Sequence, residues 1–298
     1  MNLSVIIPVY NQGKIFTKTL KALFEQNFPE EKYEIIIVDD GSIDNTLRVL
    51  NSFKNKKKNL KIFKTLSKHG KGSARNLGIK NAKNEVVVFL DGDILAHPNL
   101  LREHSNWHKK FNKKNFAMVG YITWFPKLKI TPFMNWLEHG GKQLAFDELK
   151  NNERINYNHF YTGNASLKKD FLIKNGLFDE DFGRNMYEDL ELAYRLMKKN
   201  LKIIYNKKAI GYHFHPTNPE KYSERMIRVG KGAKTLFAKH LELKDKVALS
   251  GFNFRTIFNQ IFFPIYFIIG KIFKNNCWLG FYYNAIFFRK YIEGYKQK

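Results

Sequence analysis

The stretch Glu85-Val86-Val87-Val88-Phe89-Leu90-Asp91-Gly92-Asp93 decides the fold, because an unbroken apolar run ends there in two carboxylates. A short β-branched and aromatic run of this kind is typical of a strand buried on both faces of a sheet. Two carboxylates one residue apart at a strand end suit a hard cation, and Mg²⁺ and Mn²⁺ prefer such oxygen ligands. Asp-Gly-Asp also occurs in ordinary turns, so the interpretation depends on the sequence around it.

Upstream of this run, strand and helix patterns alternate. The pattern predicts strands at 3–9, 34–38 and 60–66, and helices at 16–24, 46–53 and 73–82. Such alternation predicts βαβ units and a mostly parallel sheet. Ligands of such sheets bind beyond the carboxyl ends of the strands. Four acids fall at these ends: Asp39, Asp40, Asp91 and Asp93.

Downstream of residue 100 the pattern is looser. It predicts strands at 164–167, 201–205 and 209–213, and helices at 104–111, 169–175 and 189–199. Beyond residue 220 the character changes to a basic helix at 222–240 and a segment, 252–295, rich in Phe, Tyr and Ile with interspersed Lys and Arg. That last segment predicts one or two amphipathic helices.

Two further segments place polar groups beside predicted elements. Residues 70–76, Gly-Lys-Gly-Ser-Ala-Arg-Asn, combine flexible backbone, cations and a helix N-terminus, which suits a phosphate. They lack the spacing of a P-loop. Residues 38–42, Val-Asp-Asp-Gly-Ser, follow a strand, and their acids suit hydrogen bonds from a base or ribose. The same segment also fits a turn in which Asp44 or Asn45 caps the next helix.

In chain order, five segments resemble the successive signatures of glycosyltransferase family 2. They are Ser-Val-Ile-Ile-Pro-Val-Tyr-Asn at 4–11, the segment 38–42 with Asp44 and Thr46, Gly-Ser-Ala-Arg-Asn-Leu-Gly at 72–78, Asp-Gly-Asp at 91–93, and Tyr-Glu-Asp-Leu-Glu-Leu-Ala-Tyr-Arg-Leu at 187–196. The resemblance covers roughly residues 3–215. It implies an α/β fold of the GT-A type, a mostly parallel sheet flanked by helices.

This fold implies a division of the chain. Residues 1–220 would form the GT-A catalytic domain, with a Rossmann-like nucleotide-sugar-binding half at 1–98 merged with an acceptor half at 99–220. The basic, aromatic-rich segment 221–298 would add amphipathic helices at the C-terminal side.

The resemblance also implies donor-binding and metal-binding residues. Asp91 and Asp93 match the pair that holds a divalent metal, Mn²⁺ or Mg²⁺, on the donor diphosphate. His213 or His215 resembles the histidine that completes the coordination in some members. These two histidines alternate on an extended segment, so at most one is expected to bind the metal. The residues expected to bind the nucleotide-sugar are Pro8, Tyr10, Asn11, Asp39, Asp40, Arg75, Asp91, Gly163 and Asn164.

The expected reaction is transfer of a sugar from a nucleoside-diphosphate-sugar, with a UDP-sugar as first choice, to an acceptor hydroxyl. Asp189 matches the catalytic base and Glu188 is its alternative, although two acids at a helix start also satisfy the charge preference of a helix N-terminus. A base opposite the leaving group gives inversion. A metal, helped by Arg75 or Lys71, would stabilise the leaving diphosphate. The acceptor would be a carbohydrate or a lipid-linked sugar of the cell envelope.

Charge and composition bear on partners and location. The net charge of +24 attracts anions, although a Lys-rich surface can also be compositional bias. We expect a cytoplasmic protein, without a signal peptide or a membrane span. Its aromatic C-terminal helices would attach to the inner face of the membrane, pack on the catalytic domain, or form a dimer. One cysteine, Cys277, excludes an intramolecular disulfide and a cysteine-based zinc site.

Two other functions are alternatives to this one. A nucleic-acid-binding protein fits the charge, but the sequence holds no helix-turn-helix, zinc or RNA-binding motif, so no nucleic acid is expected as a partner. A sugar nucleotidyltransferase shares the α/β architecture and the need for metal. It usually opens with a Gly-rich loop followed by Arg and Lys, where this chain has Pro8-Val9-Tyr10-Asn11-Gln12-Gly13-Lys14.

Overall fold

The computed structural model describes residues 1–54, 57–66, 70–139, 143–144, 146–248 and 276–297. The chain divides into two compact units. The first consists of Met1–Leu128, Phe146–Gly183 and Glu188–His215, and the second of Lys129–Ala145, Arg184–Tyr187 and Pro216–Lys298. Of the predicted amphipathic segment 252–295, residues 252–275 lie outside the described residues.

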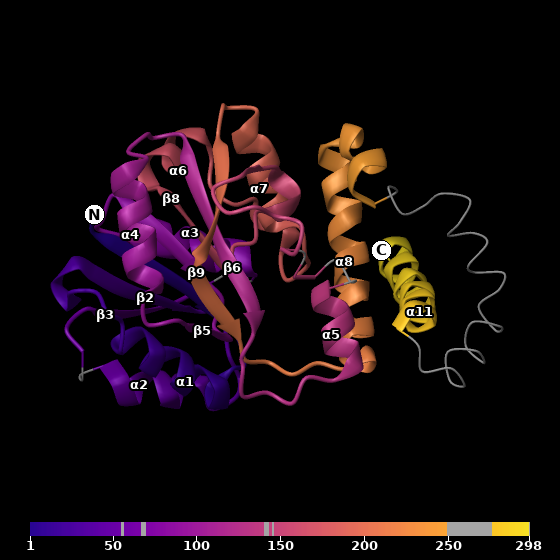
Figure 1. The fold of residues 1–298 in the computed structure, drawn as a ribbon, viewed down its shortest axis with the longest axis horizontal. Coiled ribbons are helices and arrows are strands. Elements are labelled where there is room, and N and C mark those ends of the chain that lie inside the picture. The colour runs from indigo at the N-terminus through magenta and orange to yellow at the C-terminus, as the bar shows by residue number, and fades with distance from the viewer. Residues whose placement is uncertain (55–56, 67–69, 140–142, 145, 249–275, 298) are drawn as a thin grey trace. The chain divides into compact units, whose positions relative to one another are not determined.

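The first unit is built on one sheet with the strand order β3-β2-β1-β4-β8-β6-β9-β5, and β7 pairs with β9 (Figure 1). The strands of this sheet are β1 (Leu3–Val9), β2 (Tyr33–Asp39), β3 (Leu60–Lys64), β4 (Val86–Leu90), β5 (Ile94–Ala96), β6 (Phe116–Trp124), β7 (Arg154–Ile155), β8 (Asn164–Lys168) and β9 (Lys202–His213).

Strands β3, β2, β1 and β4 are parallel to their neighbours, as the alternating pattern predicted. Every residue of β1, β2 and β4 is buried, which explains their unbroken apolar sequences. Beyond β4 the sheet is mixed. Strand β8 runs antiparallel to both β4 and β6, whereas β9 is parallel to β6.

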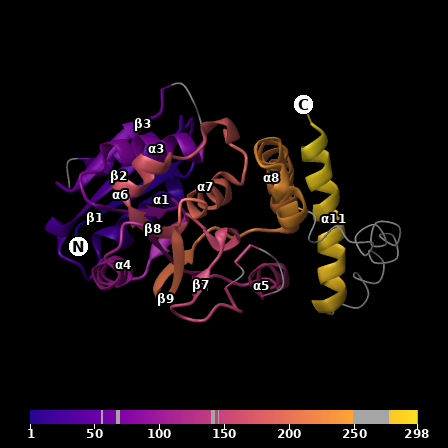
Figure 2. The same ribbon diagram turned by 90° about the horizontal axis from the view of Figure 1, so that it is seen from above.

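Helices cover both faces of this sheet. They are α1 (Gly13–Phe24), α2 (Thr46–Lys54), α3 (Lys71–Asn81), α4 (Leu100–Lys110), α6 (Lys169–Asn175) and α7 (Glu188–Met197). Ile6 faces Gly78 of α3, whereas Ser166, in register with Val88, faces His104 of α4. Because Ile6 pairs with Phe89, the residue next to Val88, these contacts lie on opposite faces. Figure 2 shows α3 and α4 on opposite sides of β8.

The second unit is helical where it is described. It contains α5 (Pro132–His139), α8 (Pro219–Lys239), the short helical turns Leu241–Leu243 and Lys244–Ala248, and α11 (Asn276–Lys296). Aromatic rings join its helices, with Phe133 of α5 packing on Tyr283 and Phe287 of α11. The backbones of α8 and α11 approach closely, because a Cβ on Gly230 or Gly294 would overlap the facing backbone.

Among the residues described, no helix has both the length and the apolar character needed to cross a bilayer.

Candidate active site

Strands β2, β1 and β4 are parallel neighbours, so their carboxyl ends lie side by side at one edge of the sheet. The predicted donor-binding residues that follow them are therefore gathered there. Pro8 is buried within β1, and Tyr10 just beyond it is 38% exposed. The remaining residues at this edge are Asn11 after β1, Asp39 and Asp40 at the end of β2, and Asp91 and Asp93 after β4.

The two acids at the end of β2 brace the neighbouring loops. Both oxygens of Asp40 accept from the backbone N–H of Gly70, at 2.9 Å each. Asp39 accepts from the backbone N–H of Ser42, and the Asn11 side chain accepts from that of Ile43. Gly70 has φ +137, and a Cβ there would overlap the Gly183 carbonyl, so this position requires glycine. The loops around the predicted nucleoside position are thus fixed by the same acids.

Asp91 lies between two cations. Lys71 Nζ is 2.7 Å from Oδ2, and Arg75 Nη2 is 2.9 Å from Oδ1. Burial by itself would raise the pKa of Asp91, but Lys71 and Arg75 outweigh it and hold that pKa well below its usual range. Lys71 is the first residue of α3 and remains about half exposed, so its ammonium group is accessible to a ligand.

Arg75 connects Asp91 to the predicted catalytic acids. Its side chain is 1% exposed, and its Nη1 donates to Glu188 Oε1 at 2.8 Å. Burial, followed by the charge of Glu188, raises the pKa of the adjacent Asp189 to about 6, although Arg75 opposes this shift. Asp189 is partly accessible, unlike the buried Glu188. The structure therefore brings Asp91, Arg75, Glu188 and Asp189 into one charged group.

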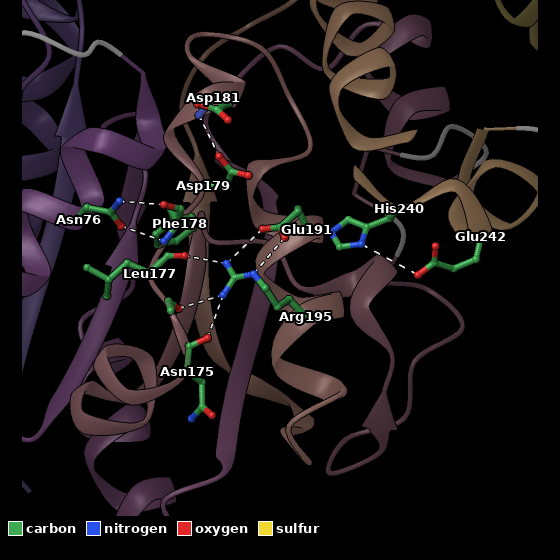
Figure 3. A network of polar contacts seen from close by, with 11 residues as sticks. Asn76, Asn175, Leu177, Phe178, Asp179, Asp181, Glu191, Arg195, His240 and Glu242 are labelled. Atoms are coloured by element: carbon green, nitrogen blue, oxygen red, sulfur yellow. Dashed lines mark hydrogen bonds and ion pairs between the residues drawn. The ribbon is translucent and has the colours of Figure 1, made fainter. Parts of the chain in front are cut away.

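A second set of polar contacts fixes the helix that carries these acids (Figure 3). Arg195 of α7 donates to the backbone carbonyls of Asn175 and Leu177 and to the carboxylate of Glu191. From the other side, the Asn76 amide of α3 donates to the Phe178 carbonyl and accepts from its N–H. The segment between α6 and α7 is thereby bound by both α3 and α7.

Gly163 and Asn164 form the side of this site that belongs to β8. The Gly163 carbonyl accepts from the backbone N–H of Asp91, and a Cβ on Gly163 would lie 3.7 Å from Asp91 Oδ2. Asn164 is fully buried, and its side chain contacts His104 and backbone carbonyls of β6 and β9. Of these two predicted donor-binding residues, Gly163 borders the acid and Asn164 lies inside the sheet.

Asp93 meets one of the two predicted histidines. Its Oδ2 is 3.5 Å from Nε2 of His213, the last residue of β9. The Trp124 ring packs edge-on against His213 and so orients the imidazole. The ring of His215 is centred 6.5 Å from that of His213. The histidine in contact with Asp93 is His213.

Within the part of the chain that the structure describes, no three His, Cys, Asp or Glu residues are arranged to hold a metal. The pair Asp93–His213 still fits a divalent ion, since one carboxylate oxygen and one imidazole nitrogen converge there. Ions of this kind commonly take one or two protein ligands and complete their shell with substrate phosphates and water. Asp91 has both oxygens engaged by Lys71 and Arg75.

The sequence interpretation did not include the residues that lie behind the site. His104 and His108 of α4 are buried and hydrogen-bonded to Ser166 and Asn164 of β8. Their spacing of four residues, which places them on one helix face, was the available signal. The predicted helix at 104–111 contains both histidines, but their partners lie about 60 residues away on β8, so the spacing alone did not identify the contact.

The family comparison agrees with this geometry. Residues 4–175, more than half of the 298-residue chain, match the family model Glycosyl transferase family 2. The chain belongs to glycosyltransferase family 2. The predicted family assignment is therefore confirmed, and the matched range contains the Asp91–Asp93 segment, Arg75 and Gly163.

Among curated proteins, this glycosyltransferase family 2 chain is 26% identical over 265 residues to the glycosyltransferase YfnE of Bacillus subtilis, covering 73% of this chain and 66% of YfnE. It is 40% identical over 117 residues to a poly(ribitol-phosphate) beta-glucosyltransferase of Bacillus spizizenii, covering 39% of this chain and 18% of that enzyme. The chain thus spans less than two thirds of the length of these relatives.

Two solved structures share the fold. The mannosyltransferase PcManGT of Pyrobaculum calidifontis, in complex with GDP-Man and Mn²⁺, has a TM-score of 0.61 at 22% identity, over 81% of this chain and 64% of that one. Residues 1–349 of S. aureus TarS give a TM-score of 0.58 at 19% identity, over 99% of this chain and 90% of that one. These likenesses confirm the predicted α/β fold of the GT-A type.

Proposed function

We propose that this protein transfers a sugar from a nucleoside-diphosphate-sugar, with a UDP-sugar as first choice, to an acceptor hydroxyl with inversion. The observation that carries the proposal is the charged chain Lys71–Asp91–Arg75–Glu188 with Asp189 beside it. It links the residues predicted to receive the donor diphosphate to the residue predicted to activate the acceptor. Family membership supports the same assignment.

The donor would bind along the carboxyl edge of β2, β1 and β4. Tyr10 and Asp40 border the expected nucleoside position, next to the loops that Asp39 and Asn11 brace. Lys71, accessible and at the N-terminus of α3, is placed to exchange its contact with Asp91 for a diphosphate oxygen. The sugar would then lie beside Gly163, where the missing Cβ leaves room next to Asp91.

Asp93 and His213 are the residues that would hold a divalent metal. When bound, Mn²⁺ or Mg²⁺ would supply Lewis-acid stabilisation of the negative charge on the departing nucleoside diphosphate. The Mn²⁺ in the PcManGT complex supports this part of the proposal. His215 is the alternative ligand if the segment after β9 rearranges.

Asp189 would act as the general base. Its raised pKa, about 6, leaves it ionised at neutral pH while keeping its affinity for a proton higher than that of an ordinary carboxylate. Glu188 is held by the buried Arg75, so its role would be to set the charge around Asp189. A base on the side of the sugar opposite the diphosphate gives in-line displacement and inversion at the anomeric carbon.

The activities named for relatives support a proposal for the acceptor. They include poly(ribitol-phosphate) glycosyltransferases and a chondroitin synthase of Pasteurella multocida. We therefore propose a carbohydrate or lipid-linked acceptor in the synthesis of a cell-envelope polysaccharide or glycolipid. A cytoplasmic enzyme attached to the inner face of the membrane would meet such acceptors, and the net charge of +24 favours an anionic surface.

A donor screen tests the proposal. Purified protein is mixed with a panel of nucleotide-sugars and Mn²⁺ or Mg²⁺, and release of nucleoside diphosphate is measured beside Asp93→Ala and Asp189→Asn. Metal-dependent release from one donor, lost in Asp93→Ala, is the expected result. If no donor is bound or hydrolysed with any metal, the proposed function is wrong. Pyrophosphate formed from a nucleoside triphosphate and a sugar phosphate would point to a nucleotidyltransferase instead.

A further inference from the structure

A buried chain of hydrogen bonds runs from α4 through β8 to an irregularity in the sheet. It links His108 to Ser166, Ser166 to His104, and His104 to Asn164 over 2.9, 2.8 and 2.9 Å. Asn164 then donates to the backbone carbonyls of Tyr121 and Ala209, at 3.1 and 2.9 Å. All four side chains in the chain are fully buried.

The direction of every bond in this chain follows from its Asn164 end. Both amide protons of Asn164 go to carbonyls, so its Oδ1 must accept and Nε2 of His104 must carry a proton. Nδ1 of neutral His104 then accepts from the Ser166 hydroxyl, whose oxygen accepts from Nε2 of His108. Burial lowers the pKa of His104 to about 4 and of His108 to about 3, which keeps both rings neutral.

The Asn164 side chain lies at a break in the register between β6 and β9. Gly120 of β6 pairs with Asn206, but the next residue, Tyr121, pairs with Ile210, so residues 207–209 of β9 form a bulge. Of the two carbonyls that Asn164 binds, that of Ala209 belongs to the bulge, and that of Tyr121 lies on β6 where the register shifts. The neighbouring strands also leave room for its amide, because a Cβ on Gly120 would overlap Asn164 Nδ2 and one on Gly211 would lie 3.4 Å from it.

Both acids of the Asp-Gly-Asp segment adjoin the structure that Asn164 fixes. Asn164 pairs with Leu90, the residue before Asp91, and Gly163 accepts from the Asp91 N–H. On the other side of the bulge, β9 continues to His213, which pairs with Ile94, the residue after Asp93. The direction in which β9 leaves the bulge therefore contributes, together with the pairing of His213 with Ile94 and Trp124, to the approach of His213 to Asp93.

We propose that Asn164, held in place by the His108–Ser166–His104 chain, is a positioning residue that sets the β9 bulge and so places His213 against Asp93 and Gly163 against Asp91. The inference deepens the proposed function and rests on it for its kinetic readout. This positioning role takes the place of the predicted direct contact between Asn164 and the donor. The Asn164 side chain is fully buried, and its oxygen and both amide protons already have partners.

The test compares substitutions along the chain with a matched control on the same helix. His104→Leu removes both contacts, and His104→Gln keeps an N–H where Nε2 donates to Asn164. Ser105→Ala is the control. Ser105 is also buried on α4, but it hydrogen-bonds to Met1 and takes no part in the His108–Ser166–His104–Asn164 hydrogen bonds. Each variant is measured by thermal unfolding, by hydrogen exchange of the backbone amides at 122–124 and 210–214, and by KM and kcat for metal-dependent donor hydrolysis.

We expect His104→Leu to raise the KM for metal or donor about 10-fold, as second-layer substitutions at metal sites typically do. Exchange at 210–214 should be faster in this variant than in the wild-type protein, while exchange in β1 and β2 stays unchanged. His104→Gln should restore KM to within about threefold, and Ser105→Ala should leave both readouts unchanged. A folded His104→Leu protein with wild-type exchange at 210–214 would overturn the inference, as would a lower melting temperature with unchanged KM.

Asn164→Ser separates positioning from direct contact. If Asn164 positions the bulge, this variant and His104→Leu shift KM together for every donor sugar tested. If Asn164 touches the sugar, only Asn164→Ser changes the preference among donors, and the inference is wrong. If the wild-type protein turns over no nucleotide-sugar, the proposed function fails, while exchange at 210–214 still decides the positioning role.

Discussion

Arg75 balances the charges of two acids that lie in different parts of the sequence. Its guanidinium group contacts Asp91 and Glu188, and Glu188 is almost as buried as Arg75 itself. Removing one partner of such a buried pair leaves an uncompensated charge, which typically costs about 3–5 kcal/mol. We expect Arg75→Met to lower the free energy of unfolding by this order in urea denaturation.

A double variant separates charge from packing. Arg75→Met together with Glu188→Gln removes the stranded carboxylate, so it should recover part of the lost stability. If the single variant unfolds at the wild-type urea concentration, the buried ion pair does not exist in solution.

The raised pKa of Asp189 predicts a pH profile. If Asp189 is the base, it must be ionised, so kcat/KM for transfer should rise as pH increases through about 6 and level off above it. Asp189→Asn should reduce transfer by about 10²–10⁴-fold and retain donor binding. Donor affinity measured by calorimetry provides the control, and a transfer rate independent of pH between 5 and 8 would argue against this role.

The same shift predicts a cost in stability. The pKa of Asp189 rises from 3.8 to about 6 on folding, so between these values the folded state binds more protons than the unfolded chain. Stability therefore falls as pH rises through this window. We expect Asp189→Asn to be more stable than wild type by roughly 1–3 kcal/mol at pH 7, because each pKa unit corresponds to about 1.4 kcal/mol and partial exposure screens the effect; the difference should shrink towards pH 4. Melting curves at both pH values check this, and a difference that persists unchanged at pH 4 would contradict it.

At the scale of elements, glycine controls how α3 packs on β1. A Cβ at Gly78 would overlap the Ile6 side chain, although alanine is the better helix former. We expect Gly78→Ala to destabilise the protein by about 1–3 kcal/mol, because overpacking outweighs helix propensity. Ile6→Ala in the same chain should relieve part of the clash, and Lys80→Ala on the exposed side of α3 is the control. A stabilised Gly78→Ala protein would show that the helix can shift.

Elements could be predicted from the sequence where burial leaves an unbroken apolar run or a clear period. Strands β1, β2 and β4 and helices α3 and α7 were found within a few residues. Strand β9 was predicted as two strands because Lys207 and Lys208 interrupt it, and the structure carries these exposed residues on the bulge. Strand β6 and the buried contact of His104 with Asn164 were missed, because they depend on pairing between segments far apart in the chain.

The candidate site was predictable to a similar degree. The family motifs identified the residues that the structure gathers around Asp91 and Asp93. They did not indicate that the Asn164 side chain is enclosed by β6, β9 and α4, since this follows from strand order. The proposed acceptor is less accessible to such reasoning, because specificity for an acceptor would depend on loop conformation rather than on residue spacing.

At the scale of the whole molecule, the net charge of +24 and the aromatic helix α11 raise the question of membrane attachment. Within the second unit, Tyr283 and Phe287 of α11 pack against Phe133 of α5, and Tyr222 of α8 packs on Phe287. These rings are therefore occupied inside the unit. Cations along α8, among them Lys221, Arg228 and Lys234, remain exposed. This arrangement favours electrostatic attraction to a surface over insertion of the α11 rings.

Flotation with liposomes tests this attachment. The protein should float with vesicles containing anionic lipid and not with neutral ones, since each Lys or Arg near an anionic surface contributes about 1 kcal/mol. Raising the salt concentration from 0.1 M to 1 M shortens the Debye length from about 10 Å to about 3 Å, so binding should be largely lost. Deletion of residues 251–298 should weaken binding if the C-terminal segment takes part, with retained donor hydrolysis as the control for folding. Unchanged flotation of the deletion variant would exclude a tail anchor and leave the cations of the remaining chain as the attracting surface.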